Sequence, residues 1–334
     1  MVAANTPHAS PPSEEEVLGY LTSLSNWGRW GDSDARGTLN FITNDVRARA
    51  GQLISSGEVV SCSWDIVPNV SEPHDVGVGP PMRLMVHTGQ GLADENKVPP
   101  VVDFGKMATA SDYIGLYYHG FRITHMDALS HIFWDRKMYN GRPAELVASG
   151  PGATELDIVA AAEGVVSRGI LIDVPRFRDI PWLGPGEALH VDELQAIISG
   201  TGVEPRPGDI LLLRTGYARK RIDEGPGSPS ADGRPGWHAS CLPWLHEHEV
   251  AAIGADAAQD VRPSYDGKTD YPNIKTPVHA VGITAMGMHL MDNCNLERLA
   301  EACSRHNRWE FFFSAAPLRL ARTTGSPLNP LAVF

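Results

Sequence analysis

Apolar runs along the chain predict buried strands, and the segments between them predict helices. Residues 169–174 form a six-residue run that starts with glycine, ends before a proline and is apolar except for Asp173, as is typical of a strand buried on both faces. The predicted strands of this kind are residues 169–174, 209–214 and 251–256. The predicted helices, from apolar spacing and capping residues, are residues 14–24, 44–55, 189–198 and 242–249. Helices that alternate with strands in this way predict an α/β fold.

Three further segments are predicted to be strands, namely residues 58–66, 82–87 and 309–320. The second of them interrupts a long stretch, residues 69–101, that is otherwise irregular and rich in proline and glycine. Loops of this length are uncommon unless they serve a site. We therefore expect this stretch to cover a cleft.

Composition and charge narrow the class of protein. The 334 residues are 42% hydrophobic and 20% charged, which is ordinary for a globular protein, and the formal net charge of −12 argues against a nucleic-acid partner. No apolar run approaches the roughly 18 residues of a membrane span. The first residues lack the basic and apolar regions of a secretory signal, so residues 1–13 are predicted to be a disordered lead-in to one domain, residues 14–334. Four scattered cysteines without a C-x-x-C pair favour reduced thiols and a cytoplasmic location.

The stretch Tyr118–Gly141 gathers the residues that most suggest chemistry. Within thirteen residues it holds His119, His125, Asp127 and His131. If residues 123–127 are extended, His125 and Asp127 point to the same face, and if a helix starts at Asp127, His131 lies one turn away on that face. Either geometry would converge imidazole and carboxylate groups that suit zinc, manganese or iron(II). The alternative is a set of buried polar residues bonded to the backbone and to one another.

This stretch resembles the signature of the metal-dependent cyclase family, which includes kynurenine formamidase and isatin hydrolase. The family motif reads H-x-G-T-H-x-D-x-P-x-H. Thr124, His125, Asp127 and His131 match it, and Leu129 stands where the family has proline. The closing residues 324–327, T-G-S-P, and the strand that ends at Arg214 in R-T-G also match.

The first histidine of the motif is where this chain departs from the family. Phe121 occupies that position, and its side chain cannot bind a metal. His119 lies two residues earlier and reaches the same place only if the backbone bulges. The metal ligands of this chain therefore need not equal those of kynurenine formamidase.

A second informative stretch covers residues 277–299. By the same resemblance, His279 is the histidine of a helix, and Asp292 stands where the family has a metal-binding acid, usually glutamate. Because the aspartate side chain is shorter, it reaches a metal only if the backbone lies closer or a water bridges the two. His289 is either an extra ligand that replaces the Phe121 position or a buried histidine bonded to the backbone.

The resemblance implies one α/β domain whose mixed, partly curled sheet is flanked by helices, as in swivelling β/α folds. It implies one or two divalent ions, zinc or manganese, held by His125, Asp127, His279 and Asp292. It also implies that His131 shuttles a proton, although spacing leaves open whether His131 binds the metal instead. The residues expected to face the substrate are Trp30, His119, Phe121 and His289. Homodimers or homotetramers are common in the family and are expected here.

These expectations favour a hydrolase that uses an activated water on a small amide, lactam or cyclic imide, with an aromatic or cyclic substrate. A lactone is the close variant on the same site. A non-catalytic small-molecule binding protein with a degraded metal site is the alternative from another class. A carbon–carbon cyclase has no motif of its own in this sequence.

Overall fold

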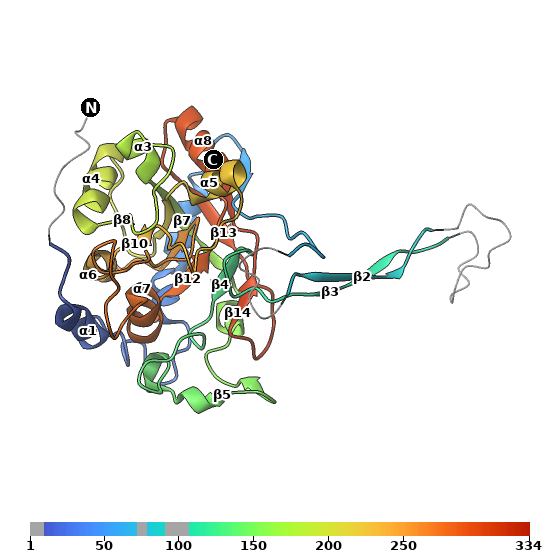
Figure 1. Cartoon of the computed structure of the whole chain (residues 1–334), viewed down its shortest axis with the longest axis horizontal. Helices are drawn as coiled ribbons and strands as arrows, with labels where there is room; N and C mark the ends of the chain where they lie inside the picture. The colour runs from blue at the N-terminus through green and yellow to red at the C-terminus, as the bar shows by residue number, and fades with distance from the viewer. Residues whose placement is uncertain (1–9, 72–78, 91–106) are drawn as a thin grey trace.

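A computed structural model describes residues 10–71, 79–90 and 107–334 of the chain, and it shows one α/β domain built on a nine-stranded, curled mixed sheet (Figure 1). The strands lie in the order β1 (Val59–Ser61), β15 (Leu331–Val333), β13 (Glu310–Ala315), β7 (Val165–Asp173), β9 (Ile210–Arg214), β11 (Ala252–Ala255), β12 (His289–Asp292), β4 (His125–Asp127) and β14 (Gly325–Pro327). The predicted fold class is confirmed.

The centre of the sheet is parallel and its two sides are antiparallel. Strands β7, β9, β11 and β12 run parallel to one another, whereas β13 and β4 pair with them in the opposite direction. Parallel neighbours need a crossover connection. The crossovers contain α3 (Val174–Arg178) and α4 (Val191–Thr201), then α5 (Tyr217–Glu224) and α6 (Leu242–Glu247), then α7 (Pro277–His279) and the π-helix Ala280–Met286.

Each face of the sheet contributes to its own hydrophobic core. Ile170 and Ile172 of β7 lie in one core with residues of α4, α6 and the π-helix, while Leu171 lies in the other with α8 (Glu297–His306). Successive side chains of a strand point to opposite faces, so a strand covered on both sides must be apolar throughout. This is why residues 170–172 and 210–213, in the middle of β7 and β9, are all apolar.

Several predicted boundaries shift in the structure. The buried strand β7 begins at Val165, four residues before the predicted start, where it pairs with β13. The predicted strand 58–66 shrinks to β1, because its only partner, β15, has three residues. Thr43 caps α2 (Asn44–Gly51) as its side chain accepts a hydrogen bond from the Val46 amide, but the helix ends before the predicted residue 55.

The remaining elements are short. Helix α1 (Glu14–Ser23) is capped by Ser13, and the Pro12 carbonyl accepts a hydrogen bond from Tyr271; residues 1–9 of the predicted lead-in lie outside the described residues. The 3-10 helices are Gly37–Phe41, Tyr139–Gly141, Ala144–Leu146, Ile158–Ala161 and Ala239–Cys241. The small sheets are β5 (Val147–Ala148) with β6 (Gly152–Ala153) and β8 (Ala188–Leu189) with β10 (Gly236–Trp237). All four cysteines are buried and free, and no helix in the described ranges is long and apolar enough to cross a bilayer.

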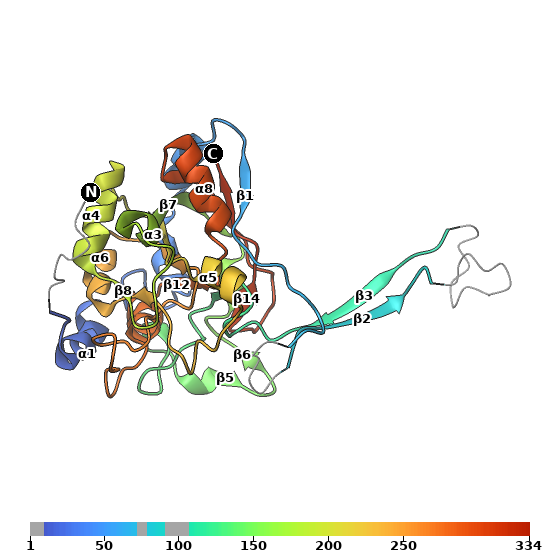
Figure 2. The ribbon, with the colours of Figure 1, turned by 45° about the horizontal axis from the view of Figure 1, so that its top comes forward.

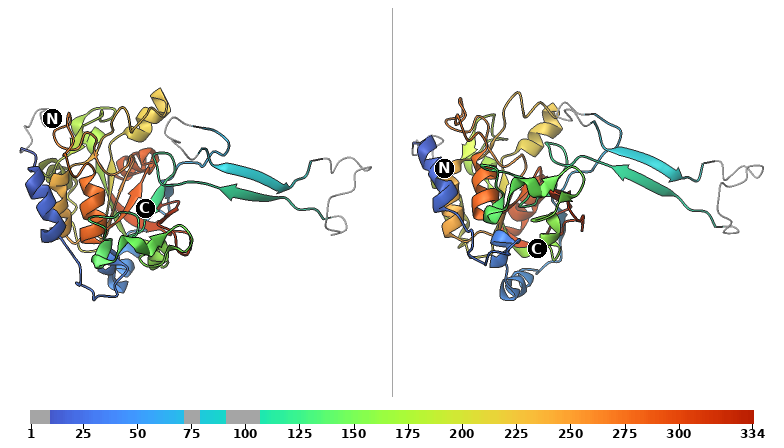
Figure 3. Two further views of the ribbon diagram at one scale, coloured as in Figure 1. Left: turned by 60° about the horizontal axis from the view of Figure 1, so that its bottom comes forward. Right: turned by 90° about the horizontal axis from the view of Figure 1, so that it is seen from below.

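A two-stranded ribbon, β2 (Met82–His87) paired with β3 (Ser111–Gly115), projects from the body of the molecule (Figures 1 and 2). The predicted strand at 82–87 is thus confirmed. We expected the stretch 69–101 to cover a cleft, but its strand β2 points away from the body in every view (Figure 3). Residues 72–78 and 91–101 of that stretch lie outside the described residues. Leu84 and Tyr113, a cross-strand pair, are each more than half exposed.

Gly37 lies very close to another backbone segment. Its φ is +55°, and a Cβ atom there would lie 1.9 Å from the Gly287 carbonyl oxygen. We expect Gly37→Ala to lower the free energy of unfolding by roughly 2–4 kcal/mol, because strain and overpacking add. Gly28→Ala is the matched control, since Gly28 also has positive φ but an added Cβ meets nothing within 4 Å. Equal losses for the two variants in urea unfolding would contradict this prediction.

Candidate metal centre

Two segments far apart in the sequence meet because strands β4 and β12 are neighbours. In their antiparallel register His125 lies opposite Asp292, and Met126 lies opposite Met291. Both methionines belong to the core on one face of the sheet. His125, Asp127 and Asp292 therefore point to the other face, where directly opposed side chains lie close together. The extended geometry predicted for residues 123–127 is confirmed at β4.

His131 reaches the same point by a turn rather than by the helix that we considered. After β4 the chain turns, and the His131 amide donates a hydrogen bond to the Ala128 carbonyl at 3.0 Å. The His131 Nε2 atom lies 3.9 Å from Asp127 Oδ1. The helical alternative for this segment is thus wrong, but the two side chains still converge.

Asp127 is the centre of the cluster. Its Oδ1 atom lies 3.1 Å from His119 Nδ1 and 3.5 Å from His125 Nε2. From the other side, His279 Nε2 lies 3.6 Å from Asp127 Oδ2 and 3.5 Å from Asp292 Oδ2. Two atoms that each bind one ion at about 2.1 Å are separated by roughly 3.0–3.4 Å, depending on the angle. The observed spacing is close to what a shared ion requires.

The surroundings of Asp127 also fit a cation. Its side chain is 1% exposed, yet neither carboxylate oxygen has a hydrogen-bond partner in the described part of the chain. A buried carboxylate that accepts no hydrogen bond is costly unless a cation compensates it. Two groups of side chains are close enough to hold an ion, and both include Asp127: one with His119 and His131, the other with His125 and Asp292. Nitrogen and carboxylate ligands of this kind suit zinc or manganese.

Hydrogen bonds from outside the cluster orient its histidines. The His125 Nδ1 atom lies 2.8 Å from the Ile123 carbonyl, so Nδ1 carries the proton and the Nε2 lone pair points toward Asp127. The His119 Nε2 atom lies 3.0 Å from Thr324 Oγ1, which leaves Nδ1 to face Asp127. His119 thus reaches the cluster, and its ring stacks on His131 with centroids 3.9 Å apart.

Burial and neighbouring charges act against each other on the pKa values here. Burial disfavours the ionised form of Asp127, but the surrounding imidazoles, led by His131, hold its pKa below the ordinary value. Burial lowers the pKa of His131 to about 4, so this ring is neutral at pH 7. At His279 burial opposes protonation, but the hydrogen bonds to Asp260 and Asp292 raise its pKa well above the usual value. A metal that binds His279 Nε2 must displace that proton.

Three residues predicted to face the substrate lie outside this cluster. His289 is three residues before Asp292 on a strand, so it points to the opposite face, where its Nδ1 lies 2.8 Å from the Asp127 carbonyl. His289 thus has the geometry expected of a buried histidine that is bonded to the backbone. Trp30 packs edge-on against Phe41, with ring centroids 5.1 Å apart. Phe121 lies under the guanidinium of Arg234. A role for these side chains in binding substrate stays a prediction.

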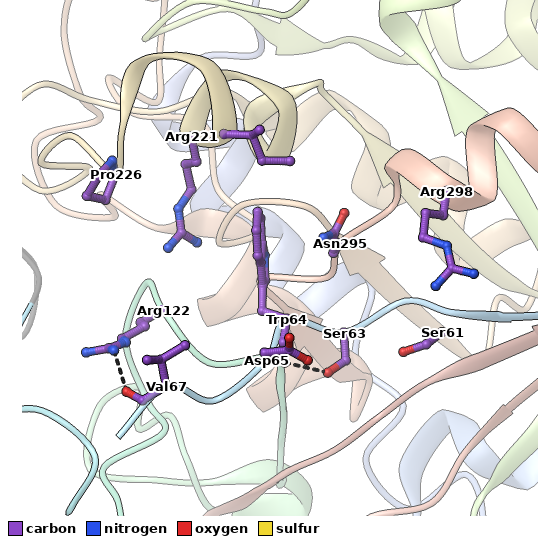
Figure 4. A pocket seen from close by; sticks show the side chains of 11 residues that line it. Ser61, Ser63, Trp64, Asp65, Val67, Arg122, Arg221, Pro226, Asn295 and Arg298 are labelled. Atoms are coloured by element: carbon purple, nitrogen blue, oxygen red, sulfur yellow. Dashed lines mark hydrogen bonds between the residues drawn. The ribbon is translucent and has the colours of Figure 1, made fainter. Parts of the chain in front are cut away.

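A cavity of about 590 Å³ lies beside β4 but is lined by none of the predicted site residues (Figure 4). Trp64, Arg122 and Arg221 lie on its walls, and the Trp64 amide donates to Thr124 Oγ1 at 3.2 Å. The Arg122 guanidinium donates to the Val67 carbonyl at 2.8 Å, so it fixes the chain that follows β1. The histidine–aspartate cluster therefore does not line this cavity.

Sequence reasoning missed two residues that hold the cluster in place. The Asp260 carboxylate accepts hydrogen bonds from the Val278 amide at 2.7 Å and from His279 Nδ1 at 2.5 Å. The Gln259 amide donates to Asp292 Oδ1 and to the Met291 carbonyl, each at 2.8 Å. Both residues follow β11 in an irregular segment without a motif. Their only sequence signal is their place just after a buried strand, where side chains of parallel sheets meet.

Asp260→Asn is expected to weaken metal binding by roughly 10- to 100-fold, because the variant no longer orients His279 through a charged acceptor. Metal affinity measured by competition with a chelator checks this. Asp270→Asn is the control, since Asp270 is also an acid paired within this region, with Arg262, but does not contact the cluster. An unchanged affinity in Asp260→Asn would show that His279 is positioned by its helix alone.

Comparison with known proteins places the chain in a family. Residues 112–259 match the sequence profile described as "Putative cyclase". A crystal structure of a novel cyclase is 32% identical, with 93% of this chain and 100% of that chain covered and a TM-score of 0.79. Isatin hydrolase A from Labrenzia aggregata is 19% identical, with 88% of this chain and 98% of that chain covered and a TM-score of 0.56. Isatin hydrolase A from Ralstonia solanacearum is 20% identical, with 87% of this chain and 98% of that chain covered and a TM-score of 0.55. The latter two share the fold, and no curated protein matches in sequence. By the identity and coverage of the first structure, the chain belongs to this cyclase family.

Proposed function

We propose that this protein is a metal-dependent hydrolase of a small amide, lactam or cyclic imide. The observation that carries the proposal is Asp127, a buried carboxylate that accepts no hydrogen bond from any described residue and is surrounded by four histidines and by Asp292. A structural polar cluster would satisfy its carboxylate with donors, as Asp256 does with the Thr215 and Gly216 amides. The fold shared with two isatin hydrolases supports the same class of reaction.

In the proposed site, some residues hold the ion and others orient the residues that hold it. The side chains that would hold a divalent ion are His125, Asp127, His279 and Asp292, with His119 in reach of the same carboxylate. A bound zinc or manganese ion supplies an acidified water and polarises the substrate carbonyl. Ile123 and Asp260 hold the tautomers of His125 and His279, so that both present Nε2.

His131 is the residue that moves the proton. Its side chain is 26% exposed, against 1% for Asp127, and its Nε2 atom is the farthest of the four histidine nitrogens from that carboxylate. A neutral imidazole at pH 7 can take a proton from the attacking water. The water oxygen bonds to the carbonyl carbon, the carbon–nitrogen bond breaks, and His131 Nε2 returns the proton to the leaving nitrogen. In a lactone the leaving atom is oxygen and the steps are otherwise the same.

The proposal is tested by metal analysis together with a substrate panel. The purified protein is expected to contain zinc or manganese by emission spectrometry and to hydrolyse at least one of a set of aryl formamides, lactams, isatin and lactones. Chelation should remove the activity, and one of the two metals should restore it. Protein without bound metal that gains no thermal stability from zinc or manganese would instead indicate a binding protein with a degraded site.

A further inference from the structure

Arg234 is a buried arginine that lies next to the candidate metal centre. Its residue is 5% exposed, and its backbone forms an antiparallel bridge with Arg262, with hydrogen bonds of 3.0 and 2.9 Å. Its guanidinium carbon lies 5.0 Å from the centroid of the Phe121 ring. Phe121 is four residues before His125, in the position where the family motif has a histidine.

Arg234 differs from Arg168 and Arg214, two other buried or partly buried arginines, in the partners of its side chain. Arg168 is paired with Asp209 and Glu310, and Arg214 with Asp173 and Glu297, at distances of 2.6–2.8 Å. Arg234 has no carboxylate within ion-pair distance in the described ranges, and its Nε atom is buried without a hydrogen-bond partner. A buried charge that is left unpaired costs several kcal/mol. Such a group is retained where something else, commonly a ligand, compensates it.

The bridges formed by its segment place Arg234 beside the metal centre, because Arg234 pairs with Arg262 and Trp237 pairs with Asp260. Asp260 and Asp292 attract its guanidinium at longer range, although burial itself lowers its pKa. Both carboxylates already have partners in the cluster, since Asp260 binds His279 and Asp292 accepts from Gln259. The ring of Phe121 offers its face to the guanidinium, which leaves the in-plane N–H groups for an acceptor.

We propose that Arg234 binds a carboxylate of the substrate, so that this enzyme acts on small amides, lactams or lactones that carry a negative charge beside the scissile bond. The inference rests on the proposed function and adds a substrate class to it. Arginine suits this task because its planar fork matches the two oxygens of a carboxylate. Phe121 stands in place of the family histidine and then has a function of its own. Its ring supports the guanidinium at the position where another member of the family would place an imidazole.

The test compares two probes that differ in charge, benzoate and benzamide, by calorimetric titration of the metal-loaded protein. Arg234→Met is expected to weaken benzoate binding by roughly 10- to 100-fold and to leave benzamide binding within about twofold. Arg234→Lys should be intermediate, because lysine keeps the charge but not the fork. Arg298→Met, at an exposed arginine of α8, should bind both probes as the wild type does. Metal content, measured on each variant, should stay unchanged.

Three results would overturn the inference. If benzoate binds Arg234→Met and the wild type with equal affinity, Arg234 does not hold the carboxylate, and the metal alone binds it. Equal losses for both probes, or a loss of metal in Arg234→Met and Arg234→Lys, would mean that Arg234 only balances the charges of Asp260 and Asp292. No benzoate binding to the wild type at millimolar concentration would also overturn it. Binding is measured without turnover, so failure of the hydrolysis panel and failure of this inference are separate outcomes.

Discussion

Asp127→Asn is expected to remove the bound metal and to lower hydrolysis by roughly 10³-fold or more, the largest effect of any single change in this protein. The asparagine is nearly isosteric, but it removes the negative charge toward which His119, His125, His131 and His279 all point. Emission spectrometry of the purified variant and the rate on the best substrate of the panel measure the two effects. Addition of zinc or manganese should raise the melting temperature of the wild type only.

Asp256→Asn is the matched control for this variant. Asp256 is also fully buried, but Thr215 and Gly216 donate three hydrogen bonds to its carboxylate, and burial raises its pKa to about 6. Its replacement should destabilise the fold by about 1–3 kcal/mol and leave the metal content intact. Full metal occupancy in Asp127→Asn would contradict the assignment of Asp127 as a metal ligand.

His131→Ala is expected to lower kcat by roughly 10²- to 10⁴-fold while the protein keeps its metal, because only the proton transfer is lost. Added imidazole should restore part of the rate, since the side chain of His131 is partly exposed and a small base can enter the space that it leaves. Turnover with and without imidazole, together with metal content, are the measurements. The effect is second in size to that of Asp127→Asn.

The same experiment decides between the two roles that spacing left open for His131. A fall in metal content in parallel with kcat, without rescue by imidazole, would make His131 a ligand, as its grouping with His119 and Asp127 allows. His246→Ala is the control, because His246 is a half-buried histidine on α6 that belongs to neither candidate metal group. It should change neither metal content nor kcat.

The parts of the fold that the sequence predicts are those that depend on local patterns. The alternation of a strand places His125 and Asp127 on one face without knowledge of any neighbour. The mainly apolar runs at 169–174 and 209–214 predict strands covered on both sides, because their short length and flanking residues favour a strand over a buried helix. The resemblance to a family then links this segment to His279 and Asp292. The structure brings all four together through the pairing of β4 with β12.

The parts that could not be predicted depend on contacts between distant segments. Nothing in the residues around Gln259 and Asp260 indicates that their side chains orient Asp292 and His279, because that contact arises from the crossover after β11. Arg234 lies in a segment rich in glycine and proline, a composition typical of exposed loops, yet the structure buries it against Phe121. Sequence patterns report which residues avoid water, but a buried charge has no pattern of its own.

The ribbon of β2 and β3 should be the part of the described chain that unfolds locally most easily. Within the described residues these two strands pair only with each other, so they gain little cooperativity from the body, and their amide protons should exchange with solvent long before those of β7 or β9. The rate of deuterium uptake by the amides of β2 and β3 therefore shows whether another molecule covers the ribbon. Slow uptake at Leu84 and Tyr113 that becomes fast on dilution would reveal a second copy of the chain seated on the ribbon, in the oligomer that the family resemblance implies.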